Sequence, residues 1–157
     1  MHQERDASWS RLRSEPWRPR GHRRAHGSGL PRVQIVSLPA FGSPSFWEIC
    51  QRGDDWLLYT AKVVNRDWHD LTVLGYEPVE FESDRLRAYF DGFVATSLPI
   101  GPDRSGMGGC DGAVTQLTLY GDLWSEVRFQ WWSHSPPAWA SVVDLTAEVL
   151  DAFEKKL

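Results

Sequence analysis

The feature that most limits how this chain can fold is the alternating segment 124–132, which ends in two consecutive tryptophans. One set of alternate positions is apolar, namely Val127, Phe129 and Trp131. The other set holds Glu126, Arg128, Gln130 and Trp132. Successive side chains of a β-strand point to opposite faces of its sheet. The segment therefore predicts a strand with one buried face and one polar face.

Other segments carry weaker strand signals. Further strands are expected at 33–38, 46–50, 56–64 and 113–120, with a short candidate at 71–74. The polar residues 52–55 join two of these strands as a hairpin, and residues 121–123 join 113–120 to the alternating segment.

Two helices complete the predicted elements. Ser83 is the expected cap of the first, whose apolar positions are Leu86, Tyr89, Phe90, Phe93 and Val94. In the second, Ser135 caps and Pro136 begins a helix with the apolar stripe Trp139, Val142, Val143, Thr146, Val149, Leu150 and Phe153. Residues 46–98 and 113–155 then each run strand, strand, helix. This ββα-ββα order predicts an α+β domain, an antiparallel sheet of about five strands with two helices packed on one face.

The charge divides the chain into two parts. The first 32 residues hold eight arginines and three acidic residues, a formal charge of +5, whereas residues 33–157 hold nine basic and 18 acidic residues, a formal charge of −9. The first part also has few apolar residues, interrupted by proline and glycine. We expect residues 1–32 to be a disordered basic extension or a misassigned start, and residues 33–157 to form one acidic domain.

Residues 1–32 have three alternative interpretations. An arginine-rich arm stacking Trp9 and Trp17 on nucleic acid needs clustered positive charge, which the interspersed acids disfavour. An organelle-targeting peptide should be poor in acids. A start near Val33 would make residues 33–38 the natural first strand.

Composition excludes several classes. Two cysteines in 157 residues exclude a disulfide scaffold, and no run approaches the roughly 18 apolar residues of a membrane-spanning helix. The N-terminus lacks the apolar core of a secretory signal. We expect a cytoplasmic protein with no membrane partner.

The unusual number of tryptophans, nine, suggests a binding surface. Trp132 shares its predicted face with Arg128 and Gln130, and an exposed aromatic beside hydrogen-bonding groups is typical of sites that bind a peptide, a sugar or a protein. The alternative is that other segments of the chain cover Trp132 as part of a second small core.

The glycine-rich segment 105–112 offers a different chemistry. Cys110 would be a nucleophile, with backbone amides of the loop as oxyanion donors and His134 or His69 as base. No signature of a cysteine-enzyme family surrounds Cys110, and a flexible turn leading into a strand explains the glycines equally well. Met107, Asp111 and His134 are instead candidate rim residues of the binding face.

Metal and cofactor sites are not expected. The cysteines and histidines show no Cys-x-x-Cys pair and no helical His spacing, and the loop lacks the Gly-Lys-Ser/Thr end of a phosphate-binding loop. The acidic residues of 77–84 and 54–55 have polar surroundings, which favours a solvated face over a catalytic carboxylate pair.

Three short motifs together resemble a group of small bacterial proteins with no known activity. These are Asp111-Gly112 before a strand, Trp131-Trp132 at the end of a strand, and Pro136-Pro137-Ala138-Trp139 opening a helix. The resemblance covers roughly residues 110–155 and implies a bacterial α+β domain without catalytic residues.

Two functions are therefore expected to compete. The first is a non-enzymatic domain that binds a protein or ligand through Arg128, Gln130 and Trp132, in the manner of an immunity protein whose acidic surface attracts a basic partner. The second is a small cysteine-dependent hydrolase or transferase built around the glycine-rich loop.

Overall fold

Six strands form one antiparallel sheet in the computed structural model of this chain, which describes residues 29–64, 73–97, 112–122 and 125–157. The strands are β1 (Leu30–Leu38), β2 (Ser45–Arg52), β3 (Asp55–Val63), β4 (Val73–Val79), β5 (Val114–Tyr120) and β6 (Glu126–Trp132). Their order across the sheet is β4-β3-β2-β1-β5-β6. The predicted α+β class is confirmed, with β4 extending the expected set of about five strands.

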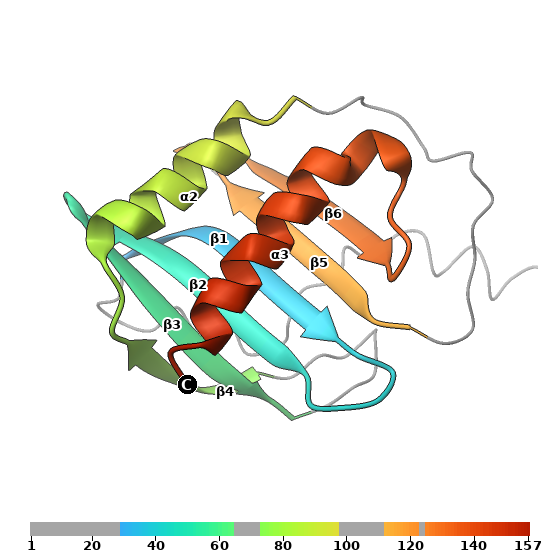
Figure 1. The fold of residues 1–157 in the computed structure, drawn as a ribbon. Helices are drawn as coiled ribbons and strands as arrows, with labels where there is room; N and C mark the ends of the chain where they lie inside the picture. The colour runs from blue at the N-terminus through green and yellow to red at the C-terminus, as the bar shows by residue number, and fades with distance from the viewer. Residues whose placement is uncertain (1–28, 65–72, 98–111, 123–124) are drawn as a thin grey trace, which may run out of the picture.

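The N-terminal strand lies in the middle of the sheet. β1 pairs with β2 on one side and with β5 on the other, so it joins the β2-β3-β4 meander to the β5-β6 hairpin (Figure 1). The β2-β3 turn contains Gly53 at φ +62°, a left-handed conformation that glycine adopts without strain. β1 begins at Leu30, three residues before the predicted strand, while residues 1–28 lie outside the described part of the chain.

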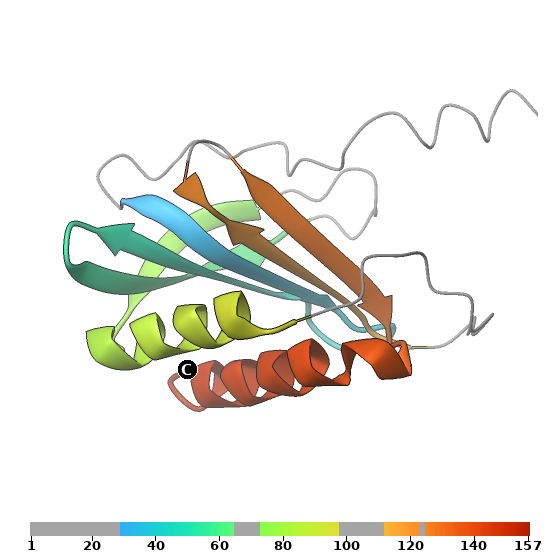
Figure 2. The ribbon, with the colours of Figure 1, turned by 90° about the horizontal axis from the view of Figure 1, so that it is seen from above.

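Both helices cover the same face of the sheet, as the sequence predicts (Figure 2). Helix α2 (Ser83–Ala95) and helix α3 (Ala140–Glu154) run antiparallel to each other (Figures 1 and 2). Among the described residues, no helix is long and apolar enough to cross a membrane.

The helix starts differ from the prediction. Glu82 holds the N-cap position of α2, while Ser83 Oγ accepts a hydrogen bond from the backbone N–H of Trp56 at 2.9 Å. Pro136 is extended, and a short 3-10 turn, η2 (Pro137–Trp139), precedes α3. The prediction was wrong at both caps. The Ser83 hydroxyl bonds to strand β3 and does not cap its own helix, and the 3-10 turn begins at Pro137, the second of the two prolines.

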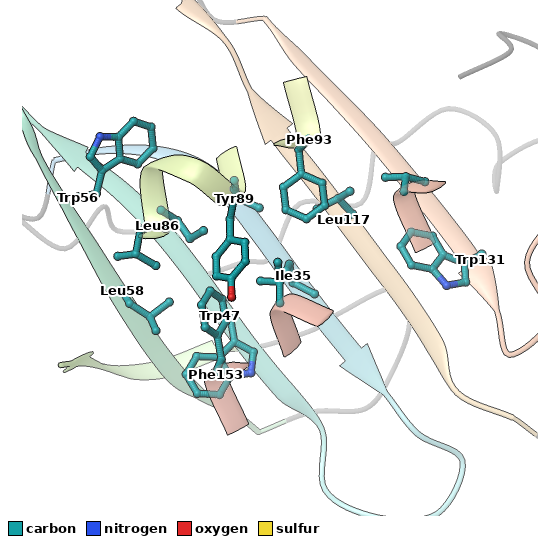
Figure 3. Packing of buried hydrophobic residues seen from close by; sticks show 14 residues of the cluster. Ile35, Trp47, Trp56, Leu58, Leu86, Tyr89, Phe93, Leu117, Trp131 and Phe153 are labelled. Carbon is teal, nitrogen blue, oxygen red and sulfur yellow. The ribbon is translucent and has the colours of Figure 1, made fainter. Parts of the chain in front are cut away.

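The main core lies between the helices and the sheet (Figure 3). Trp47 of β2 packs on Phe153 of α3 with ring centroids 5.3 Å apart, and Tyr89 of α2 meets the same ring edge-on at 6.1 Å. A smaller apolar cluster lies on the opposite face, where Phe46 and Tyr76 make an edge-to-face contact at 5.6 Å. The face away from the helices is therefore apolar near β4.

Candidate functional site

Strand β6 is the last strand of the sheet and separates the tandem tryptophans. Trp131 points into the main core and is 8% exposed, whereas Trp132 points to the opposite face and is 38% exposed. Arg128 and Gln130 share the face of Trp132, because they alternate with Phe129 and Trp131 along the strand. Gln130 is exposed and Arg128 is half-buried.

Trp132 does not stand alone at the sheet edge, because the backbone before β5 lies against its indole. A Cβ atom on Gly112 would lie 2.5 Å from Trp132 Nε1, which only a glycine avoids. The backbone N–H of Ala113 donates to Ser133 Oγ at 2.7 Å beside it. Gly112 and Trp132, which belong to two of the motifs singled out in the sequence, are thus in contact.

Arg128 ends a row of polar side chains that crosses the face away from the helices. Strand pairing aligns the members of this polar row, which are Tyr59, Glu48, Gln34, Thr118 and Arg128. Arg128 Nη2 also donates to Glu126 Oε1 on its own strand at 3.4 Å. A positive charge at the sheet edge is thus held in a fixed position.

The inner part of the polar row is a buried hydrogen-bond network around Glu48. Gln34 Nε2 donates to Glu48 Oε2 at 2.5 Å, and the Cys50 thiol donates to Glu48 Oε1 at 3.2 Å. The hydroxyl of Tyr120 donates to Gln34 Oε1 at 2.6 Å. Each partner satisfies a group that would otherwise be costly to bury.

The tyrosines around this network are held in the protonated form. Burial, together with the negative charges of Glu126 and Glu48, raises the pKa of Tyr120 to about 12, against a smaller opposing effect of Arg128. Burial is also the main cause that raises the pKa of Tyr59 and of Tyr76. These phenols are protonated at neutral pH, and that of Tyr120 donates to Gln34.

The sequence reasoning missed this network. The signal was present, since alternation in β1 and β2 puts Gln34, Glu48 and Cys50 on the face opposite Ile35, Trp47 and Ile49. What the sequence did not supply was the strand order that brings Gln34 between Glu48 and Tyr120.

A pocket of about 600 Å³ opens on the other face of β6, between the helices and the end of the sheet. Val127 and Phe129 line it from β6, Phe93 from α2, and Trp139 and Val142 from η2 and α3. Phe129 and Trp139 meet edge-on with ring centroids 5.7 Å apart. Sequence analysis did not foresee this pocket, because its lining residues come from two helices and two strands that are distant in the sequence.

Gly92 lies where the two helices are in contact. A Cβ atom on Gly92 of α2 would lie 3.3 Å from Leu145 of α3, so the helices approach closely at this point. The pocket lies beyond it, toward the C-terminus of α2 and the N-terminus of α3. Packed helices lie 8–10 Å apart and neighbouring strands about 4.8 Å apart, so that one helix covers about two strands. Two helices therefore cover only part of a sheet of six strands.

The remaining candidates divide into two groups. His134 is exposed, two residues after β6. Met107, Cys110 and Asp111 lie outside the described residues, so the cysteine-enzyme alternative stays a prediction. Within the described ranges, no three His, Cys, Asp or Glu side chains gather as they would around a metal ion.

Comparison of the chain with protein-family models, with curated proteins and with solved structures gives no match. The function is therefore argued from the geometry of β6 and its surroundings.

Proposed function

We propose that this chain is a non-enzymatic domain that binds another protein through β6, with Arg128, Gln130 and Trp132 as the contact residues. The observation that carries the proposal is the unequal burial of the tandem tryptophans, which leaves an indole 38% exposed at the edge of the sheet. Tryptophan and arginine dominate the binding energy of protein interfaces. Gly112 and Glu126 support Trp132 and Arg128, which lowers the entropy cost of using them.

The charge of the domain indicates the class of partner. Residues 33–157 carry a formal charge of −9, and the exposed side of α3 presents Asp144, Glu148 and Asp151. Such a surface accelerates encounter with a basic protein and disfavours nucleic acid. Neutralisation of a basic toxin, as an immunity protein performs it, is one role that fits this chemistry.

Affinity capture with three matched baits tests this proposal. The baits are the wild-type chain, Trp132→Ser, and Leu74→Ser, which alters an exposed apolar residue on the opposite edge strand β4. A true partner is retained by wild type and by Leu74→Ser and lost by Trp132→Ser.

The purified partner is then titrated against the same three chains. We expect Trp132→Ser to weaken binding by about 2 kcal/mol or more, the cost typical of a central interface residue. Arg128→Ala should weaken binding and reduce the salt dependence of the association rate. Equal binding by all three chains would refute the role of β6.

A further inference from the structure

The two edges of the sheet are built differently. At one edge, β4 contains Pro78 and Gly75, the latter at φ +65°, and its pairing with β3 shifts register between Thr60 and Lys62. Proline and bulges are devices that stop further strands from pairing. At the other edge, β6 pairs with β5 without a register shift and contains neither glycine nor proline. Of the two edges (Figure 1), β6 is the one suited to accept another strand.

The pocket of about 600 Å³ lies directly beside this edge. Val127 is 53% exposed and lines the pocket together with Glu126, Arg128 and Phe129 of the same strand. A strand that paired with β6 would place alternate side chains about 4.5–5.5 Å from Val127 and Phe129, at the mouth of the pocket. Its remaining side chains would face Arg128 and Trp132 on the other side of the sheet.

The chemistry of the pocket selects the side chain that enters it. The hydroxyl of Thr96 donates to the backbone carbonyl of Gly92 at 2.9 Å, and the hydroxyl of Ser125 donates to that of Asp122 at 2.9 Å. These hydroxyl protons are therefore already used within the chain. The charged lining residues Glu126 and Arg128 pair with each other, and the other walls are mainly aromatic and aliphatic. An uncharged apolar side chain fits such a site.

We propose that the partner binds as an extended segment that adds to β6 as a seventh strand, with an apolar side chain in the pocket and basic residues beside it. This inference rests on the proposed function and specifies its mode of binding. The basic residues follow from the formal charge of −9 on residues 33–157, since Asp122 and Glu126 at this end of β6 already pair with Arg32 and Arg128. A second copy of this domain is disfavoured as the occupant, because two domains of formal charge −9 repel each other.

A defined peptide tests this mode with the full chain. The probe alternates leucine with threonine over seven residues between terminal lysines. Addition of a strand should shift the backbone amide resonances of β6 and the indole resonance of Trp139 in a nitrogen–proton correlation spectrum. A peptide with serine in place of leucine should bind at least tenfold more weakly, because it leaves the pocket empty.

Backbone methylation distinguishes a paired strand from simple apolar adhesion. In an added strand, alternate amides face β6, so methylating the leucine amides or the threonine amides gives two peptides of which one binds and one does not. Equal binding of both methylated peptides, or no shift of β6 amides at millimolar peptide, would overturn the proposal.

Two variants matched in exposure locate the site. Val127→Lys places a charge at the pocket mouth and should weaken peptide binding at least tenfold, whereas Leu74→Lys, at a residue 55% exposed on β4, should leave it unchanged. Both residues are exposed, so both variants should retain the wild-type unfolding midpoint. Equal weakening by the two variants would contradict the assignment to β6.

Hydrogen exchange of the β6 amides that point away from β5 tests the other occupants in the free chain, because the alternate amides are already protected by pairing with β5. Protection that rises with protein concentration would assign the edge to a second copy, and protection independent of concentration would assign it to a segment of this chain; either result overturns the proposal. If the captured partner is lost by Trp132→Ser but retained by Val127→Lys, partner binding at β6 stands and strand addition fails.

Discussion

At the scale of single residues, the buried hydrogen-bond network on the face away from the helices is centred on the carboxylate of Glu48. This carboxylate lies in the sheet with the Gln34 amide and the Cys50 thiol as donors. Tyr120 closes the network through Gln34. A buried polar network of this kind favours one strand pairing over others, because any shift by one residue leaves its members without partners.

Replacement of Tyr120 by phenylalanine should change both stability and its pH dependence. At pH 8 we expect the free energy of unfolding to fall by about 1 kcal/mol, since the hydrogen bond to Gln34 is lost. Because the folded-state pKa of Tyr120 is raised to about 12 from 10, folding favours the protonated phenol. Its contribution is complete below pH 10 and is lost between pH 10 and 12. Urea unfolding across this range should show the wild type losing its advantage over Tyr120→Phe as pH rises; a constant difference would contradict this.

Fluorescence quenching by a neutral quencher should separate the tandem tryptophans. Trp132→Phe removes an indole that is 38% exposed and should reduce the quenchable fraction, whereas Trp131→Phe removes one that is 8% exposed and should not. Trp131→Phe should instead lower the free energy of unfolding by about 1–3 kcal/mol, because it leaves a gap in the core. An unchanged quenchable fraction in Trp132→Phe would mean that the indole is covered in solution.

At the scale of elements, local sequence patterns predicted most of the strands of the sheet, but not the polar row or the pocket that the sheet helps to form. The β2-β3 hairpin and the apolar stripe of α3 follow from spacings of two and of three to four residues, which are properties of single segments. The face that carries Trp132 was predictable for the same reason. Strand β4 was expected only as a short stretch, because Gly75 and Pro78 obscure its pattern.

The features that sequence analysis missed depend on non-local pairing. Ser83 could not be recognised as an acceptor for Trp56, which lies 27 positions away in the sequence. The polar row forms only because β1 lies between β2 and β5. The sequence of β1 does not indicate which strands are its neighbours. The pocket is lined by residues of α2, β5, β6, η2 and α3, which are brought together only by the tertiary fold.

At the scale of the whole molecule, the fold depends on β1, the first strand that the structure describes. β1 is the only strand that links the meander to the β5-β6 hairpin among the described residues. Arg32 reinforces this link, because its Nε donates to Gln51 of β2 at 2.9 Å and its Nη1 donates to Asp122 after β5 at 2.8 Å. The guanidinium also lies 5.8 Å from the ring centroid of Phe90 in α2.

These contacts predict where the chain can be shortened. Removal of residues 1–28 should leave the free energy of unfolding within about 0.5 kcal/mol of the full chain, since that segment has few apolar residues and is interrupted by proline and glycine. Removal of residues 1–32 should lower it by about 1–3 kcal/mol more, through loss of the Arg32 hydrogen bonds and of the first pairs of β1 with β2. Arg32→Met should show the side-chain part of this loss alone. Urea unfolding of the four chains would check the order, and equal stability of the two shortened chains would mean that the domain begins at Val33.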